Sequence, residues 1–275
     1  MLLIIGMIIG LVLGLTGAGG SVFAVPLLIL LAGMPMADAV GISLGAVAAS
    51  TIYGSLRNLV QKQSAPLLWK PGVILAGAGA LTAPLGKWLG LQIPELWLVS
   101  GFSVLAMVIA LRMWLGASKN PAAASVVRAG NFAHIPSPGL ICSMSASGQF
   151  ELRPRCVSGL LIGGLLVGLL SGLLGVGGGF LIVPLLLALS AVSIMQAVST
   201  SLFIIGLISS SGFISHLLMS GNNDWPLLGL VAAGGVIGML LGQTISHKIA
   251  NALLQKIFAI SLLIICLITF ARNFL

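Results

Sequence analysis

Residues 14–28 read GLTGAGGSVFAVPLL, and residues 172–186 read GLLGVGGGFLIVPLL. With a constant shift of 158 residues, nine of these fifteen positions are identical. Chance similarity between apolar segments would not keep one register across so many glycine, proline and serine positions, so the sequence predicts an internal duplication. The same shift aligns Ala39-Val40 with Ala197-Val198, Ser43-Leu44 with Ser201-Leu202 and Gly54 with Gly212, and after a two-residue gap Leu85-Gly86 aligns with Leu241-Gly242 and Phe102 with Phe258.

The composition places most of the chain in lipid. Of the 275 residues, 59% are hydrophobic and 6% are charged, whereas an ordinary soluble domain carries roughly 25% charged residues. The apolar blocks Leu91–Leu111, Leu227–Ile245 and Ile249–Phe270 are each near the ~20 residues that cross a bilayer. They are continuously apolar and do not alternate, so they indicate helices and exclude barrel strands. The predicted fold is an all-α, polytopic membrane bundle.

Each copy has the same organisation. A first apolar stretch (1–33 or 157–190) contains the glycine cluster, and three further helices follow. The predicted units are a first transmembrane repeat over 1–115, an irregular cytoplasmic connector over 116–155 and a second repeat over 156–275. The further helices are predicted at 37–60, 67–90 and 92–115 in the first copy, and at 193–219, 225–246 and 249–273 in the second.

The glycine clusters predict a break in the first helix of each copy. They run from Gly17 to Gly20 and from Gly175 to Gly179, and Pro26 or Pro184 follows. Each glycine costs about 1 kcal/mol of helix propensity relative to alanine. Unwound backbone at membrane depth survives only inside protein or along a wet cavity, and paired broken helices are typical of transporter binding sites.

The glycine clusters have two alternative interpretations besides a broken helix. A nucleotide-binding loop is disfavoured because no Gly-Lys-Ser/Thr follows either cluster. Close helix packing is the other alternative, and elsewhere in the chain it is the preferred interpretation. That preference covers Gly10-xxx-Gly14, Gly164-xxx-Gly168, Gly77, Gly79, Gly234, Gly235 and Gly238.

The expected substrate site consists of neutral donors. Backbone N–H groups at a half-helix N-terminus favour negative charge, and hydroxyls on the following helices would add to them, although such hydroxyls often only bond to the preceding turn. The candidates are Gly17, Gly19, Gly20 and Ser21 at the first break, Gly175, Gly177, Gly178 and Gly179 at the second, and Ser43, Thr200 and Ser201 on the helices that follow.

The charged residues favour an anion and leave the topology open. Asp38, Glu95, Glu151 and Asp224 all fall at helix ends or in loops, with Asp38 as an expected N-cap, so no carboxylate relay or cation site is expected. Arg57-Asn58 and its counterpart Ser215-His216 are candidate anion-binding positions, with an interfacial Arg57 as the alternative. No metal site and no disulfide are indicated by the three cysteines.

The distribution of Lys and Arg bears on orientation. Ten of the twelve lie in or near inter-helix connections, as positive-inside loops do, so the net charge of +8 does not suggest nucleic-acid binding. If each broken segment is a re-entrant hairpin, the copies are inverted and only Lys87 and Arg272 oppose the basic face. If each segment crosses once, the copies are parallel. The charge bias favours the inverted arrangement.

The doubled GxGG…VPLL motif, the two Ala-Val-x-x-Ser-Leu segments and His216…Gly221-Asn-Asn-Asp-Trp225 resemble the TauE/SafE family of sulfite exporters. The resemblance covers essentially the whole chain. It implies a secondary transporter of sulfite, a sulfonate or a related sulfur-containing anion in the bacterial inner membrane.

We expect export by alternating access about the paired breaks, with a proton as the coupling ion and the lipid bilayer as the surroundings. A passive anion channel and a carrier of a different small anion are the alternatives. No enzyme is expected, since no HExxH and no intramembrane acid pair is present, and no cofactor is expected.

Overall fold

The computed structural model describes residues 1–16, 20–61, 67–119, 142, 154–190, 192, 194–219 and 225–246, with a few positions between 260 and 268. Within these residues every element is helical apart from one isolated bridge between Cys142 and Ser190. The all-α prediction is therefore confirmed. The elements are α1 Leu2–Thr16, η1 Gly20–Phe23, α2 Ala24–Ala32, α3 Met36–Gln61, α4 Trp69–Gln92, α5 Glu95–Lys119, α7 Pro154–Leu174, α8 Gly179–Leu189, α9 Ile194–Met219 and α10 Trp225–Ser246.

Five of these helices (α3, α4, α7, α9 and α10) are long and apolar enough to cross a membrane. The ends of α3, α4, α9 and α10 lie within two residues of the predicted ones, whereas α7 begins three residues before the predicted 157 and α5, predicted over 92–115, spans Glu95–Lys119. The block Leu91–Leu111 is divided, because Pro94 disfavours a helical residue before it and α5 begins only at Glu95. The predicted helix 249–273 lies almost wholly outside the described residues. The chain is a multi-pass membrane protein.

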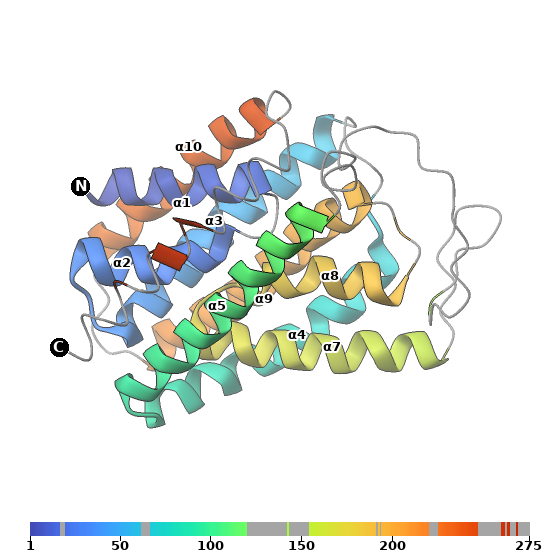
Figure 1. Ribbon diagram of the computed structural model, residues 1–275, viewed down its shortest axis with the longest axis horizontal. Helices are drawn as coiled ribbons and strands as arrows, with labels where there is room; N and C mark the ends of the chain where they lie inside the picture. Colours follow the sequence, from blue (N-terminus) through green and yellow to red (C-terminus); the bar gives the residue numbers. More distant parts are fainter. Residues whose placement is uncertain are drawn as a thin grey trace.

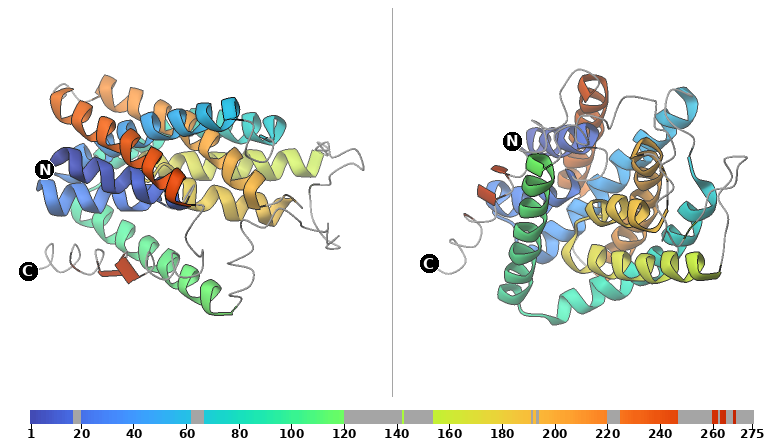
Figure 2. Two further views of the ribbon diagram at one scale, coloured as in Figure 1. Left: turned by 90° about the horizontal axis from the view of Figure 1, so that it is seen from above. Right: turned by 45° about the vertical axis from the view of Figure 1, so that its right-hand side comes forward.

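α3 and α9 run antiparallel through the middle of the molecule (Figure 1). Gly45 on α3 faces Phe213 on α9, and Gly206 on α9 faces Ile52 on α3. The outer helices pair across the sequence, since α1 packs along α10 and α4 packs along α7. α5 lies at the edge of the bundle (Figure 2), where it contacts α3.

Glycines bring the backbones of these outer pairs together. A Cβ atom on Gly10 of α1 would collide with the carbonyl of Gly235 on α10, and one on Gly168 of α7 would collide with the carbonyl of Gly79 on α4. The close-packing interpretation is confirmed at these positions. It is wrong for Gly77, where an added Cβ would meet nothing within 4 Å. The same close approach is found at Gly6, Gly14, Gly164, Gly172, Gly234, Gly238 and Gly242.

The second glycine cluster separates α7 from α8, α1 ends at Thr16 just before the first cluster, and the chain turns back between the two helices of each pair. α2 returns toward the end of the molecule where α1 begins (Figure 1). α8 returns along α7, because Leu189 near its end lies against Gly159 near the start of α7. The two hairpins enter the bundle from opposite ends (Figures 1 and 2). Residues 17–19 lie outside the described part of the chain.

Two expectations about polar residues are corrected by the structure. Asp38 is not the N-cap of α3, which begins two residues earlier at Met36. The N–H of Met36 donates instead to Glu95 Oε1 from α5, at 2.7 Å. Cys142 and Cys156 are joined by a disulfide that links the connector to the start of α7. Their spacing matches no motif, so the sequence carried no signal for this pair.

Candidate functional site

The backbone of the second break is a loop with three glycines in the left-handed region. Gly175, Gly177 and Gly178 have φ angles of 70°, 67° and 70°, which side chains rarely tolerate. The N–H of Gly175 donates to Ser171 O, and the next backbone donors are Leu181 and Ile182, both to Gly178 O. The N–H groups of residues 176–180 are therefore without a backbone acceptor at the N-terminus of α8. Successive free N–H groups in such a turn form a concavity suited to an anion.

Buried hydroxyls gather around this break. Ser43 on α3 donates to Gly175 O at 2.8 Å and fixes the loop. The hydroxyls of Ser21, Ser171 and Ser209 have no hydrogen-bond partner, although all three residues are 0% exposed. An added Cβ on Gly177 would lie 3.0 Å from Ser209 Oγ, so this hydroxyl is directed at the loop. Unsatisfied buried hydroxyls are rare, so these three groups are available to donate to a ligand or a water.

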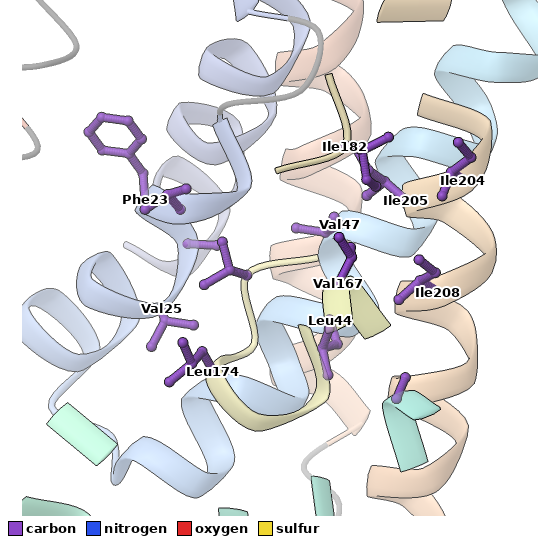
Figure 3. Close-up of a cluster of buried hydrophobic side chains, with 14 of the residues drawn as sticks. Phe23, Val25, Leu44, Val47, Val167, Leu174, Ile182, Ile204, Ile205 and Ile208 are labelled. Carbon is purple, nitrogen blue, oxygen red and sulfur yellow. The ribbon is translucent and has the colours of Figure 1, made fainter. Parts of the chain in front are cut away.

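Apolar side chains enclose the break. Val47 from α3 and Ile205 from α9 lie against Gly177, and Val167 from α7 lies against Gly178 (Figure 3). All are buried, and so are the glycines themselves. The site is therefore closed to solvent in this conformation. In such a low-dielectric environment the loop dipoles act on a charge more strongly than in water.

The first break is described only in part. Gly20 lies so close to α1 that an added Cβ would collide with the backbone of Leu13. Ser21 follows it in η1, and η1 contacts α8 from the second break. The two breaks thus meet in the middle of the bundle. Gly17 and Gly19 lie outside the described residues, so their assignment stays a prediction.

Two predicted hydroxyl candidates have other partners. Thr200 Oγ1 accepts a hydrogen bond from the N–H of Leu68 at 3.2 Å, at the start of α4. Ser201 donates to Val198 O one turn back on α9, at 2.8 Å. The Ser201 contact is the bond to the preceding turn that the alternative anticipates, whereas the Thr200 contact joins α9 to the start of α4.

The structure separates Arg57 and Asn58 from His216. His216 lies over Gly41 near the start of α3, since an added Cβ on Gly41 would collide with its ring. Arg57 follows Gly41 by 16 residues on the same helix, which is about 24 Å. Arg57 Nη1 is buried without an acceptor. The two positions therefore belong to opposite ends of α3, and neither group adjoins the other.

Two functional-looking residues lacked a clear signal in the sequence. Ser211 on α9 donates to Ala80 O at 2.6 Å, and this carbonyl is the one that Pro84 leaves without its helical donor. Lys87 was expected at a membrane face, but its side chain on α4 is only 2% exposed. Its counterpart in the second copy is Gln243, and this polar pairing is the one signal that could have indicated a buried position.

Comparisons with known proteins agree with this architecture. A family model described as "Sulfite exporter TauE/SafE" matches residues 2–269. A "Probable membrane transporter protein" of Xylella fastidiosa (strain 9a5c) is 28% identical over 274 residues, which cover 98% of this chain and 93% of that protein. The "Probable membrane transporter protein YunE" of Bacillus subtilis (strain 168) is 29% identical over 96% of this chain and 94% of its own length. No solved structure matches the chain.

Proposed function

Because the chain belongs to the sulfite exporter TauE/SafE family, we propose that it is a secondary transporter of a small sulfur-containing anion. Sulfite, a sulfonate or a related organosulfur anion is the substrate class, and export across the inner membrane is the direction. The free N–H groups of residues 176–180, with the unpartnered hydroxyls of Ser171 and Ser209, carry this proposal. The oxygens of a sulfur oxyanion accept hydrogen bonds from donors of this kind.

We propose that two inverted repeats, over 1–115 and 156–275, form this site together. The reciprocal glycine contacts support the proposal. The Gly10–Gly235 approach between α1 and α10 has its counterpart in the Gly168–Gly79 approach between α7 and α4. Each repeat thus packs its first helix against the third helix of the other. The α1–α2 and α7–α8 hairpins enter the bundle from opposite ends, as inverted repeats would (Figure 1).

Alternating access about the paired breaks follows from this arrangement. A site between two inverted repeats opens to one face or the other as the repeats tilt. The complete burial of Ser171, Ser209 and the glycines of the second break fits an occluded state of such a carrier. A proton is the proposed coupling ion. A channel would instead need a continuous polar path when open.

Purified protein in liposomes tests the proposal through uptake of sulfite and sulfonates, with and without an imposed pH gradient. We expect saturable, gradient-dependent flux that is lost in Gly177→Ala. A Cβ at this position would lie 3.0 to 3.2 Å from Ser209, Val47 and Ile205. A positive φ adds about 1–2 kcal/mol of strain for a residue with a side chain. The loop would therefore move and its donors would no longer converge.

Gly77→Ala is the matched control, because its added Cβ meets nothing and alanine favours the helix. It is expected to transport like the wild type. Normal flux in Gly177→Ala, with the variant inserted and folded, would remove the second break from the binding site. Flux that does not saturate and is not accelerated by substrate on the opposite side would favour the channel. Absence of flux with every sulfur anion would overturn the substrate class.

A further inference from the structure

Lys87 is a buried cation that the proposed transport site does not yet use. It lies on α4, five residues before the helix ends, and is 2% exposed. Its Nζ donates one hydrogen bond, to Ala37 O at 2.8 Å. An ammonium group carries three donors. Within the described part of the chain no carboxylate lies at ion-pair distance from Nζ, although the charge of Asp38 acts on it from further away.

A buried ammonium with one neutral acceptor and its nearest carboxylate beyond ion-pair distance is only partly compensated. Removing a charge from water costs several kcal/mol unless another charge or a set of hydrogen bonds compensates. Ionisable residues inside a membrane span usually mark a pathway for an ion or a substrate. An anion that passes Lys87 would provide the missing charge.

The surroundings of Lys87 connect it to the second break. An added Cβ on Gly172 would lie 2.9 Å from the backbone nitrogen of Lys87, so α4 packs here on the last turn of α7. α7 leads directly into Gly175, which lies against Val40 of α3. Val40 follows Ala37 by three residues, about 4.5 Å along the helix axis. The ammonium group therefore bonds to α3 within one turn of the loop.

His216 borders the same region. Its ring lies over Gly41, the residue after Val40, and it is 5% exposed. The charges of Lys87 and Asp38 both act on it. One cation, one imidazole and the N-terminal end of α3 thus lie on one side of the second break, where α3, α4, α7 and α9 meet.

For each of Lys87, His216 and Asp38, the corresponding position in the other copy holds a neutral amide. Lys87 aligns with Gln243, His216 with Asn58 and Asp38 with Gln196. Gln243 also adjoins the matching place on α1, since an added Cβ on Gly14 would lie 3.0 Å from its backbone nitrogen. The other copy thus has an amide at the position that corresponds to Lys87.

From this geometry we propose that Lys87 is an anion-binding residue, which pairs with the transported anion as it moves between the second break and the membrane face where α3 begins. The inference rests on the proposed function and adds to it a positively charged binding position beside the neutral donors of the break. His216 lines this position. The ligand class is a singly charged sulfonate or sulfur oxyanion.

Uptake of methanesulfonate into liposomes, with the uncharged dimethyl sulfone as competitor, tests the inference. The two molecules are close in shape, but only methanesulfonate is charged. In Lys87→Gln, which installs the residue of the second copy, we expect the KM for methanesulfonate to rise about tenfold or more, since a hydrogen-bonded charge pair is lost. The preference for methanesulfonate over dimethyl sulfone should fall by a similar factor. Lys87→Arg should keep that preference.

Lys70→Gln is the matched control, because Lys70 is exposed at the other end of α4 and should behave like the wild type. Lys87→Met is a second neutral variant, to be used if Lys87→Gln is not recovered as folded protein. An unchanged preference in the neutral variants would overturn the inference, and so would an equal loss of both ligands, which indicates a structural role. Wild-type protein that neither transports nor binds a sulfur anion would instead overturn the proposed function.

Discussion

Ser209 and Ser210 are neighbours on α9, but their hydroxyls have different surroundings. Ser210 donates to Gly206 O at 2.6 Å, one turn back on its own helix. Ser209 Oγ has no partner and lies beside Gly177. A buried hydroxyl without a hydrogen bond costs roughly 1–3 kcal/mol. This free-energy cost falls at a position that faces the second break. Such a placement is expected if the bound anion accepts the hydrogen bond of Ser209.

Ser209→Ala is therefore expected to separate stability from transport. The variant should be as stable as the wild type or more stable in thermal unfolding, because an unsatisfied donor is removed. Its KM for the transported anion should rise about tenfold, which corresponds to one lost hydrogen bond to a charge. Ser210→Ala is the matched control and should leave KM unchanged. A Ser209→Ala variant with the KM of the wild type would show that this hydroxyl does not contact the substrate.

At the level of single residues, the structure gives the predicted site residues different surroundings. Neutral donors near the glycine clusters were expected, and Ser43 lies at the second break. Thr200 instead accepts a hydrogen bond from Leu68 at the start of α4. No local sequence pattern predicts this bond, because the two residues are 132 positions apart. Lys87 was missed because a lysine near a helix end usually reaches the membrane surface. Only its three-dimensional neighbours show that it is buried.

At the level of elements, glycine stripes decide which helices can approach each other. Helices in lipid gain no hydrophobic energy from pairing, so close backbone packing has to hold them together. Gly10 on α1 and Gly168 on α7 align with each other in the proposed repeats, and each faces a backbone carbonyl of the partner helix. A side chain at either position would force the helices apart.

Gly10→Ile and Gly168→Ile are expected to destabilise the protein by similar amounts. Overpacking a well-packed interface typically costs about 1–3 kcal/mol, and both interfaces here involve backbone atoms that cannot rotate away. Thermal unfolding in detergent measures the loss. Gly101→Ile on α5 is the control, since an added Cβ there meets nothing within 4 Å. A large loss at one of the two equivalent sites and none at the other would contradict the proposed symmetry.

The elements themselves were largely predictable, while their partners were not. Uninterrupted apolar length and the glycine clusters predicted the helices and the second break, because these depend on local composition. The pairing of α1 with α10, rather than with a helix of its own copy, depends on surfaces distant in sequence. The capping of Met36 by Glu95 is equally non-local, since the two residues are 59 positions apart.

At the level of the whole molecule, two indicators of sidedness disagree. Lys and Arg concentrate around the connector, which favours the cytoplasm for that face. The disulfide between Cys142 and Cys156 lies on the same side, and disulfides persist mainly in oxidising compartments. The basic residues act during insertion, before any disulfide can form. We therefore expect the connector to be cytoplasmic and the cysteine pair to be reduced in the cell.

Single cysteines in a cysteine-free background test the topology. In the inverted arrangement, Leu2→Cys and Pro35→Cys lie on one face, because the α1–α2 hairpin returns to the side where it started, and Arg155→Cys lies on the other. In a parallel arrangement, Leu2→Cys and Arg155→Cys would share a face and Pro35→Cys would oppose them. We expect a membrane-impermeant maleimide to label the first two positions in intact cells, and Arg155→Cys only after lysis. Labelling of Arg155→Cys together with Leu2→Cys would refute the inverted repeats, and with them the alternating-access geometry proposed for the two breaks.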